Sequence, residues 1–318
     1  MKVLIGYDGS ESGDAIFEDL KRAGLPRESE ALIVSVVDLF ANSPAISEFD
    51  LQSLASRRAE AVLMRAQAHR EGVIKETEDL AAKAADRLRS QFPEWKVETS
   101  VKTGTPVSDL INAANDWNAD LIAVGSQGRS AIGRFFLGSV SKRIATDARC
   151  SVRVARSAAP KNADEPTRII VGVDGSPTAE EAIYAVGHRV WQSGTEVRLV
   201  AVDDSNPPTR IAARLPQAAA MINSYFQTRE TRVSSMLDWA IKELNNIGLK
   251  TSVFTEKGDP KNILLEEAER WNADSIFVGT RDFNSTFERF RLGSVSTIVV
   301  TNAHCSVEIV RPTDKGQD

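Results

Sequence analysis

The feature that most constrains the fold of this chain is an internal repeat. The segment Val3 to Ser10 reads V-L-I-G-Y-D-G-S, and Ile169 to Ser176 reads I-I-V-G-V-D-G-S. Three later landmarks recur in the same order: Gly104-Thr105-Pro106 with Gly258-Asp259-Pro260, Trp117-Asn118-Ala119-Asp120 with Trp271-Asn272-Ala273-Asp274, and Leu137-Gly138-Ser139 with Leu292-Gly293-Ser294. With 318 residues, the chain has room for two domains of roughly 150 residues each. We therefore predict two copies of one domain, at residues 1–156 and 167–311, with a linker at 157–166 and a disordered tail at 312–318.

Each copy alternates apolar runs with helix-compatible segments. In the first copy we expect strands near residues 3–6, 31–37, 96–103, 121–124 and 151–155. Apolar residues recur at helical spacing between Asn42 and Gln91, so we expect one long or two broken amphipathic helices there. Strands that alternate with helices imply right-handed crossovers and a doubly wound parallel sheet. The predicted fold class is α/β, with two tandem Rossmann-like domains that each hold a five-stranded parallel sheet flanked by helices.

The stretch from Gly125 to Ser139 carries the clearest functional signal. It follows the apolar run 121–124 and reads G-S-Q-G-R-S-A-I-G-R-F-F-L-G-S. Glycines at 125, 128 and 138 allow bare backbone N–H groups to approach a phosphate, and we expect Ser139 to be the N-cap of a helix whose N-terminus attracts anions. Asp8 ends the first strand, and a parallel sheet brings both features to the same edge. The pattern predicts a nucleotide phosphate cradle; the alternative is that the glycines only turn a strand into a loop.

Several motifs together resemble those of one protein family. The strand-end D-G-S, the G-x-P before a helix, the G-x2-G-x9-G-S loop and the last strand after Cys150 resemble the universal stress protein family in its tandem form. The resemblance implies an adenine nucleotide alpha hydrolase-like fold. It also implies that the last strands of the two domains, Ser151–Ala155 and Ser306–Val310, pair across a two-fold axis to form an internal pseudo-dimer.

The resemblance also implies roles for individual residues. In ATP-binding members the glycine loop holds ribose and phosphates, while the strand-end Asp and a residue ending the second strand hold adenine. These roles fall on Gly125, Gly128, Gly138 and Ser139, with Asp8 and Val37 on the adenine side. Arg129 lies inside the loop and could reach a phosphate oxygen. Each also has a plainer interpretation: Asp8 as a turn residue, Val37 as a core residue and Arg129 as a solvated side chain.

The second copy departs from the glycine pattern. Gly279 is followed by Asp282 at the position of the second glycine, and Gly293 comes one residue late. A carboxylate at that position repels an anion, and any side chain there obstructs close backbone approach. We therefore predict that the phosphate cradle of the second copy is damaged.

These features lead to a prediction of function with two alternatives. We expect a non-enzymatic protein of stress response or signalling that holds ATP, or else ADP or AMP, in the first copy, with or without Mg²⁺. No catalytic residue and no metal-binding residue is predicted. The first alternative is a slow ATP-hydrolysing switch, although the chain lacks the G-x4-G-K-[ST] loop of many ATPases. The second is a structural module that binds no nucleotide.

Composition limits the partners. A net charge of −5 and a pI near 5.5 favour neither nucleic acid nor an anionic membrane as a partner. No apolar run approaches the ~20 residues of a membrane helix, and no signal-peptide core follows Met1, so we expect a cytoplasmic location. The two cysteines, Cys150 and Cys305, form no CxxC motif and are interpreted as small buried residues. The expected partners are an adenine nucleotide and an unknown downstream protein, and a homodimer of whole chains is left open.

Overall fold

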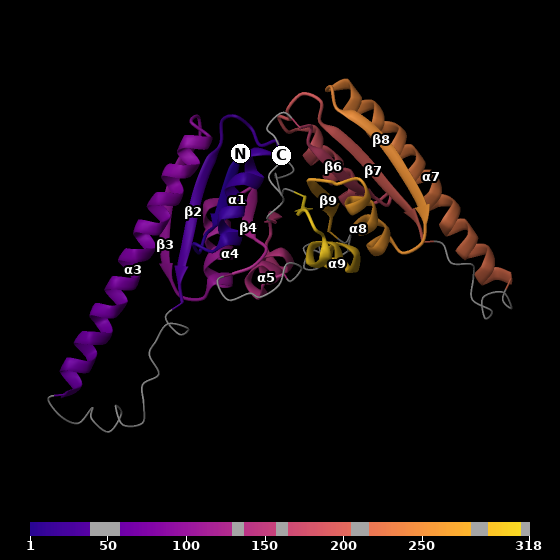
Figure 1. Ribbon diagram of the computed structural model, residues 1–318. Coiled ribbons are helices and arrows are strands. Elements are labelled where there is room, and N and C mark those ends of the chain that lie inside the picture. The colour runs from indigo at the N-terminus through magenta and orange to yellow at the C-terminus, as the bar shows by residue number, and fades with distance from the viewer. Residues whose placement is uncertain (39–57, 129–136, 157–164, 205–215, 281–291, 313–318) are drawn as a thin grey trace.

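The structure is a computed structural model that describes residues 1–38, 58–128, 137–156, 165–204, 216–280 and 292–312. Most of the predicted linker and tail lies outside these ranges, as do residues 42–57 of the long region expected to be helical. Figure 1 shows two similar halves that lie side by side and meet in the middle of the molecule.

The predicted repeat appears as the same order of elements in both halves of the chain. The first half, called domain one below, contains β1 (Lys2–Gly6), α1 (Glu11–Lys21), β2 (Glu30–Val37), α3 (Arg58–Gln91), β3 (Lys96–Thr103), α4 (Pro106–Trp117), β4 (Leu121–Gly125), α5 (Ser139–Asp147) and β5 (Ser151–Ala155). Domain two contains β6 (Arg168–Val173), α6 (Pro177–Gly187), β7 (Glu196–Asp203), α7 (Pro216–Asn246), β8 (Lys250–Lys257), α8 (Pro260–Arg270), β9 (Ser275–Gly279), α9 (Ser294–Asn302) and β10 (Ser306–Val310).

The ten strands in the described ranges form one continuous sheet in the order β3-β2-β1-β4-β5-β10-β9-β6-β7-β8. Pairing is parallel inside each half and antiparallel between β5 and β10. The predicted α/β class, with five parallel strands in each domain, is therefore confirmed. The predicted pairing of Ser151–Ala155 with Ser306–Val310 is confirmed as well, since these two strands join the halves.

Alternate residues of the strands supply two apolar layers. In β1, Leu4 packs on the side of α4 and α5, whereas Val3 and Ile5 pack on the side of α1 and α3. This two-sided burial is why inner strands such as β1 and β4 read as continuous apolar runs. The layer that contains α4, α5, α8 and α9 is a single cluster that crosses the boundary between the domains, whereas the layer on the opposite face is divided into one cluster per domain.

The repeated landmarks also share backbone conformations. Asn118 follows α4 with φ of 53°, and Asn272 of the second W-N-A-D segment has φ of 52°. Asparagine tolerates this left-handed conformation better than most residues, and the conformation ends the helix before the next strand. The repeat therefore includes the positions at which helices stop.

The region around residues 42–91 contains one long helix in its described part. This helix, α3, has 34 residues, and its counterpart α7 has 31. Both continue beyond the outer strands of the sheet (Figure 1). Among the residues that the structure describes, no helix has both the length and the apolar composition needed to cross a membrane.

Candidate functional site

The candidate site of domain one lies where β1 and β4 end and α1 and α5 begin. Ser126 N donates to Ala155 O at 2.9 Å, and Ser141 Oγ donates to Gly125 O at 2.6 Å. A Cβ added to Gly125 would lie 2.7 Å from the carbonyl carbon of Ser12 at the start of α1. Close backbone packing therefore accounts for Gly125 without any ligand. Gly279 has the same relation to Thr178 in domain two.

Gly128 and Gly138 have a different environment, because their missing side chains leave space at the site itself. A Cβ on Gly128 would meet Asp8 Oδ2 at 3.5 Å, which is an ordinary contact distance. A Cβ on Gly138 would lie 3.4 Å from Gln127 Cα and 3.6 Å from Gly128 N. The structure thus brings the strand-end aspartate and two of the three predicted loop glycines together.

Asp8 is exposed and uses one carboxylate oxygen in a turn. Its Oδ1 accepts a hydrogen bond from Ser10 N at 3.0 Å, and Gly9 between them has φ of +75°. Ser10 in turn caps α1, since its Oγ accepts from Gly13 N at 3.1 Å. The turn role considered for Asp8 is therefore present in the structure, while Oδ2 of the same carboxylate faces the position of Gly128.

The expectation that Ser139 is the N-cap of the following helix was wrong by one residue. Gly138 occupies the N-cap position with φ of −62° and ψ of 154°, and Ser139 is the first residue of α5. The N–H of Gly138 donates to Ser126 O at 2.7 Å, and its carbonyl accepts from Lys142 N at 2.9 Å. These two backbone bonds fix the start of α5, so no side-chain cap is used. Arg129 lies outside the described residues.

Val37 is a buried strand residue, 3% exposed, whose carbonyl accepts a hydrogen bond from Gly104 N at 3.1 Å. The register allows its place to be compared with domain two. Because Gly6 pairs with Val34 and Gly172 with Val200, Val36 corresponds to Val202 and Val37 to Asp203. Domain two has a pocket at the matching place, which is described below. Val202 is among the described residues that line this pocket, and Asp203 is not. Because strand side chains alternate between the faces of the sheet, Val36 and not Val37 corresponds to a residue that lines this pocket.

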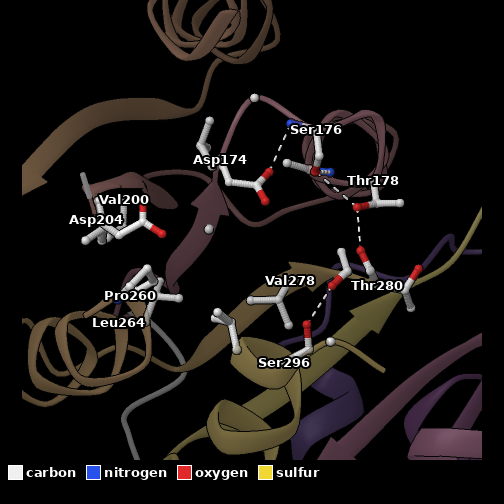
Figure 2. Close-up of a pocket in the computed structure, with 18 of the residues that line it drawn as sticks. Asp174, Ser176, Thr178, Val200, Asp204, Pro260, Leu264, Val278, Thr280 and Ser296 are labelled. Atoms are coloured by element: carbon white, nitrogen blue, oxygen red, sulfur yellow. Dashed lines mark hydrogen bonds between the residues drawn. The ribbon is translucent and has the colours of Figure 1, made fainter. Parts of the chain in front are cut away.

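Domain two contains a pocket of about 520 Å³ at the matching place (Figure 2). The hydrogen bonds at its rim repeat those of domain one. Asp174 Oδ1 accepts from Ser176 N at 3.0 Å, and Ser296 Oγ donates to Gly279 O at 2.7 Å. Most of its apolar lining comes from three strands and α8: Val173, Val200, Val202, Pro260, Leu264 and Val278. The repeated D-G-S motif already indicated that Asp174 ends the first strand of the second copy, whereas nothing in the sequence indicated the pocket itself. Asp282 lies outside the described residues.

Two arginines of α7 also line this pocket, and sequence reasoning missed both. Arg229 forms an ion pair with Asp204, and Arg232 lies beside the Asp174-Gly175 turn, with its Cβ 3.4 Å from the position of a Cβ on Gly175. Aligning the buried Leu88 with Leu244 and Ala84 with Ala240 places Val73 and Glu76 at the matching positions of α3. The helices over the two sites therefore differ in charge. A comparison of the sequences of the two long helices would have revealed Arg229 and Arg232 as a difference between the two copies.

Neither cysteine is an activated thiol, and each stands directly before the last strand of its domain, at the edge of the sheet opposite the candidate site. Burial raises the pKa of Cys150 to about 11 and that of Cys305 to about 12. Burial also raises the pKa of Tyr7 to about 12, assisted by the hydrogen bond from its hydroxyl to Asp14 Oδ1 at 2.9 Å. No group of three or more His, Cys, Asp or Glu among the described residues is arranged to hold a metal ion.

Comparisons with known proteins agree with this arrangement. The model of a family described as the universal stress protein family matches residues 1–156 and again residues 166–311. A universal stress protein of Mycobacterium tuberculosis is 34% identical over 118 residues, which span 37% of this chain and only 39% of that protein's length. One from Mycolicibacterium smegmatis is 26% identical over 218 residues, covering 68% of this chain and 69% of its own length. The crystal structure of a universal stress protein from Archaeoglobus fulgidus shares the fold, with a TM-score of 0.63 at 20% identity over 99% of this chain and 97% of that one.

Proposed function

Because this chain belongs to the universal stress protein family, we propose that it binds an adenine nucleotide in domain one, without turning it over, and acts in stress response or signalling. The observation that carries the proposal is the meeting of Asp8, Gly128 and Gly138 at the carboxyl ends of β1 and β4. Ligands of open α/β sheets bind at this edge.

The phosphate end of the nucleotide would lie against the N-terminus of α5. The first N–H groups of a helix, here those of Ser139 and Val140, have no partner within the helix, and the helix dipole favours an anion there. Gly138 contributes through its missing side chain, because its own N–H already donates to Ser126 O. The carboxylate of Asp8 accepts hydrogen bonds, so it suits an amino or hydroxyl group of the nucleoside end.

ATP, ADP and AMP all share this chemistry, and the proposal covers each. With ATP, Mg²⁺ would enter on the phosphate oxygens with the Ser139 hydroxyl as a ligand, since this ion uses few protein ligands. The ion would supply charge neutralisation of the phosphates.

Domain two is proposed to be the pairing partner and not a second site for the same nucleotide. Its pocket keeps Asp174 and the apolar lining. In the sequence of its glycine loop, however, Asp282 replaces the second glycine and Gly293 comes one residue late. A count of bound nucleotide tests this assignment. Denaturing the purified protein and quantifying released adenine nucleotide should give one per chain. Two per chain would show that domain two also binds, and none after saturation would favour a structural module.

The loop assignment is tested by Gly128→Asp, which installs the residue found in the second copy. A carboxylate beside Asp8 Oδ2 and the incoming phosphate should weaken nucleotide binding at least tenfold, measured by calorimetric titration, while the far-ultraviolet circular dichroism stays unchanged. The matched control is Gly72→Asp on α3, where an added Cβ meets nothing within 4 Å. Equal affinity in the two variants would overturn the assignment of the loop.

The remaining parts of the proposal have their own readouts. Steady turnover of added ATP by the wild type, lost in Gly128→Asp, would replace the non-enzymatic proposal with the slow ATP-hydrolysing switch. We also propose a cytoplasmic location and a downstream protein that recognises the nucleotide-bound form. Fractionation tests the location, and comparing the proteins co-purified with wild type and Gly128→Asp tests the partner. Sedimentation of the whole chain tests for a homodimer.

A further inference from the structure

The strands that join the two domains pair about a centre of near two-fold symmetry. Arg153 of β5 lies directly opposite Glu308 of β10, flanked by the pairs Val154 with Val307 and Val152 with Ile309. Ser151 pairs with Leu121, and Ser306 pairs with Ser275, at the start of the equivalent strands β4 and β9. Arg153 and Glu308 therefore occupy the same position in their respective domains, and that position lies on the symmetry axis.

The contacts of Arg156 and Arg311 beside this axis are the same from both sides. Arg156 N donates to Ser306 Oγ at 3.1 Å, and Arg311 N donates to Ser151 Oγ at 3.1 Å. The guanidinium of Arg156 donates to carbonyl oxygens of α9, and that of Arg311 donates to carbonyl oxygens of α5. Contacts of this kind would be available equally to two copies of domain one or to two copies of domain two. They hold the domains together without selecting which domain pairs with which.

The charges at the axis break the symmetry. Arg153 donates to Asp19 at 2.6 and 2.8 Å and to Glu308 Oε2 at 3.2 Å, and Glu308 also accepts from Arg189. All four side chains are at most 7% exposed. The order Asp19–Arg153–Glu308–Arg189 alternates in sign, and the supporting charges differ between domains: Ala185 corresponds to Asp19 and Ala23 to Arg189.

Pairing like with like would put equal charges in contact at this buried centre. Two copies of domain one would place Arg153 opposite Arg153, and two copies of domain two would place Glu308 opposite Glu308. Asp19 and Arg189 would still neutralise their own neighbours, but the central contact would be repulsive and each central group would lose its partner across the strands. Unpaired or like charges are most costly where water is excluded.

A second contact beside the axis also favours pairing of domain one with domain two, in this case through the shapes of the side chains. Gly24 and Val190 each stand three residues beyond the first helix of their domain, and Val190 N donates to Gly24 O at 2.8 Å. A Cβ on Gly24 would lie 2.6 Å from the ring of Trp191, so the indole occupies space that only glycine leaves. In a pair of two domains two, the side chain of Val190 would occupy that space. In a pair of two domains one, Leu25 would stand in place of Trp191 and leave the space underfilled.

We infer that the charge tetrad Asp19–Arg153–Glu308–Arg189, with the Gly24–Trp191 contact, is a recognition code that makes the β5 edge of domain one accept only a domain with a carboxylate at the centre of its last strand. The partner that fits is domain two of this chain. A second copy of domain one, or a related domain with a basic residue at the central position, is rejected.

The test uses two charge-reversed full-length chains, Arg153→Glu and Glu308→Arg. Each alone should lose its internal pairing and sediment as an opened single chain, because both the internal and the self-associated contact join like charges. Mixing the two should restore an Arg153–Glu308 contact between chains and give a species of twice the mass. Arg143→Glu, an exposed substitution on α5 with the same change of charge, should remain compact and unaffected by mixing. Unaltered compactness of both reversed chains, or self-association of either one, would overturn the inference.

A double-mutant cycle with neutral glutamine substitutions serves as the test if the charge-reversed chains do not fold. Arg153→Gln, Glu308→Gln and the double variant should show a coupling of at least tenfold in the unfolding equilibrium constant. The control pair is Arg143→Gln with Asp147→Asn, an exposed pair at 3.0 Å, for which the coupling should be within about threefold. Equal coupling in the two cycles would show that the central contact does not select its partner.

Discussion

At the scale of single residues, the two cysteines show how burial controls the reactivity of a thiol. The sequence places Cys150 and Cys305 directly before the last strand of each copy, where a small apolar residue suffices. Cys305 is 1% exposed, and Cys150 is partly buried. Because burial disfavours the thiolate, the pKa of each thiol is raised and neither is activated as a nucleophile.

The raised pKa of Cys305 predicts a loss of stability in alkaline solution. The thiol has an ordinary pKa of 9.0 when unfolded and about 12 when folded, so the folded state retains the proton and stability is fully present below pH 9. Between pH 9 and 12 the unfolded state loses this proton first, and stability falls by up to about 1.4 kcal/mol for each pH unit. Urea unfolding at pH 8 to 10.5 should show a shallower decline for Cys305→Ala than for wild type. If stability declined with pH equally in both proteins, Cys305 would not be the group responsible.

At the scale of elements, the starts of the helices separate local from non-local causes. Ser10 and Ser176, the serines of the two D-G-S motifs, cap α1 and α6 through bonds to backbone N–H groups of the same turn. Ser139 does not cap α5, because the start of that helix is fixed by a bond from Gly138 to Ser126 across the loop. A motif therefore predicts a cap reliably where the capping bond stays within neighbouring residues.

This difference predicts that the same substitution, serine to alanine, destabilises the protein at one position and has little effect at the other. Ser10→Ala should lower the free energy of unfolding by about 1 kcal/mol, since the N–H of Gly13 loses its acceptor. Ser139→Ala should change it by less than about 0.5 kcal/mol in nucleotide-free protein, because no cap is lost. Urea denaturation of both variants at equal protein concentration measures the difference. A larger cost at Ser139 would contradict the cap assignment.

At the scale of the whole molecule, the two domains are joined by one sheet and one shared apolar layer. The cluster that includes Ile144 of α5 and Val299 of α9 crosses the boundary, and Arg311 reaches from the end of β10 to the carbonyls of Cys150, Ala145 and Thr146 in domain one. The domains should consequently unfold together.

Removing Arg311 tests this coupling. Arg311→Ala leaves three buried or part-buried carbonyl groups without their donor and should cost about 2–3 kcal/mol. In scanning calorimetry we expect the single transition of the wild type to split into two. Arg143→Ala, which removes an exposed arginine from α5, is the control and should leave one transition. A single transition in Arg311→Ala would show that the shared apolar layer is sufficient for coupling.

The sequence by itself determined the two copies, the order of strands and helices, and the residues at the strand ends. These depend on apolar periodicity and on turn motifs such as the D-G-S at Asp8 and Asp174, which act over a few neighbouring residues. It also identified β5 and β10 as the strands that meet, through resemblance to a family.

Only the tertiary structure decided which side chains share a site. Val36 and not Val37 corresponds to a pocket position because strand register sets which face a residue occupies. The arginines of α7 and the contact of Arg153 with Glu308 join residues far apart in the chain, and no local pattern encodes such pairs. The sequence specified the elements through short-range forces, whereas the pairing of the domains arose from the placement of charge and shape across their common axis.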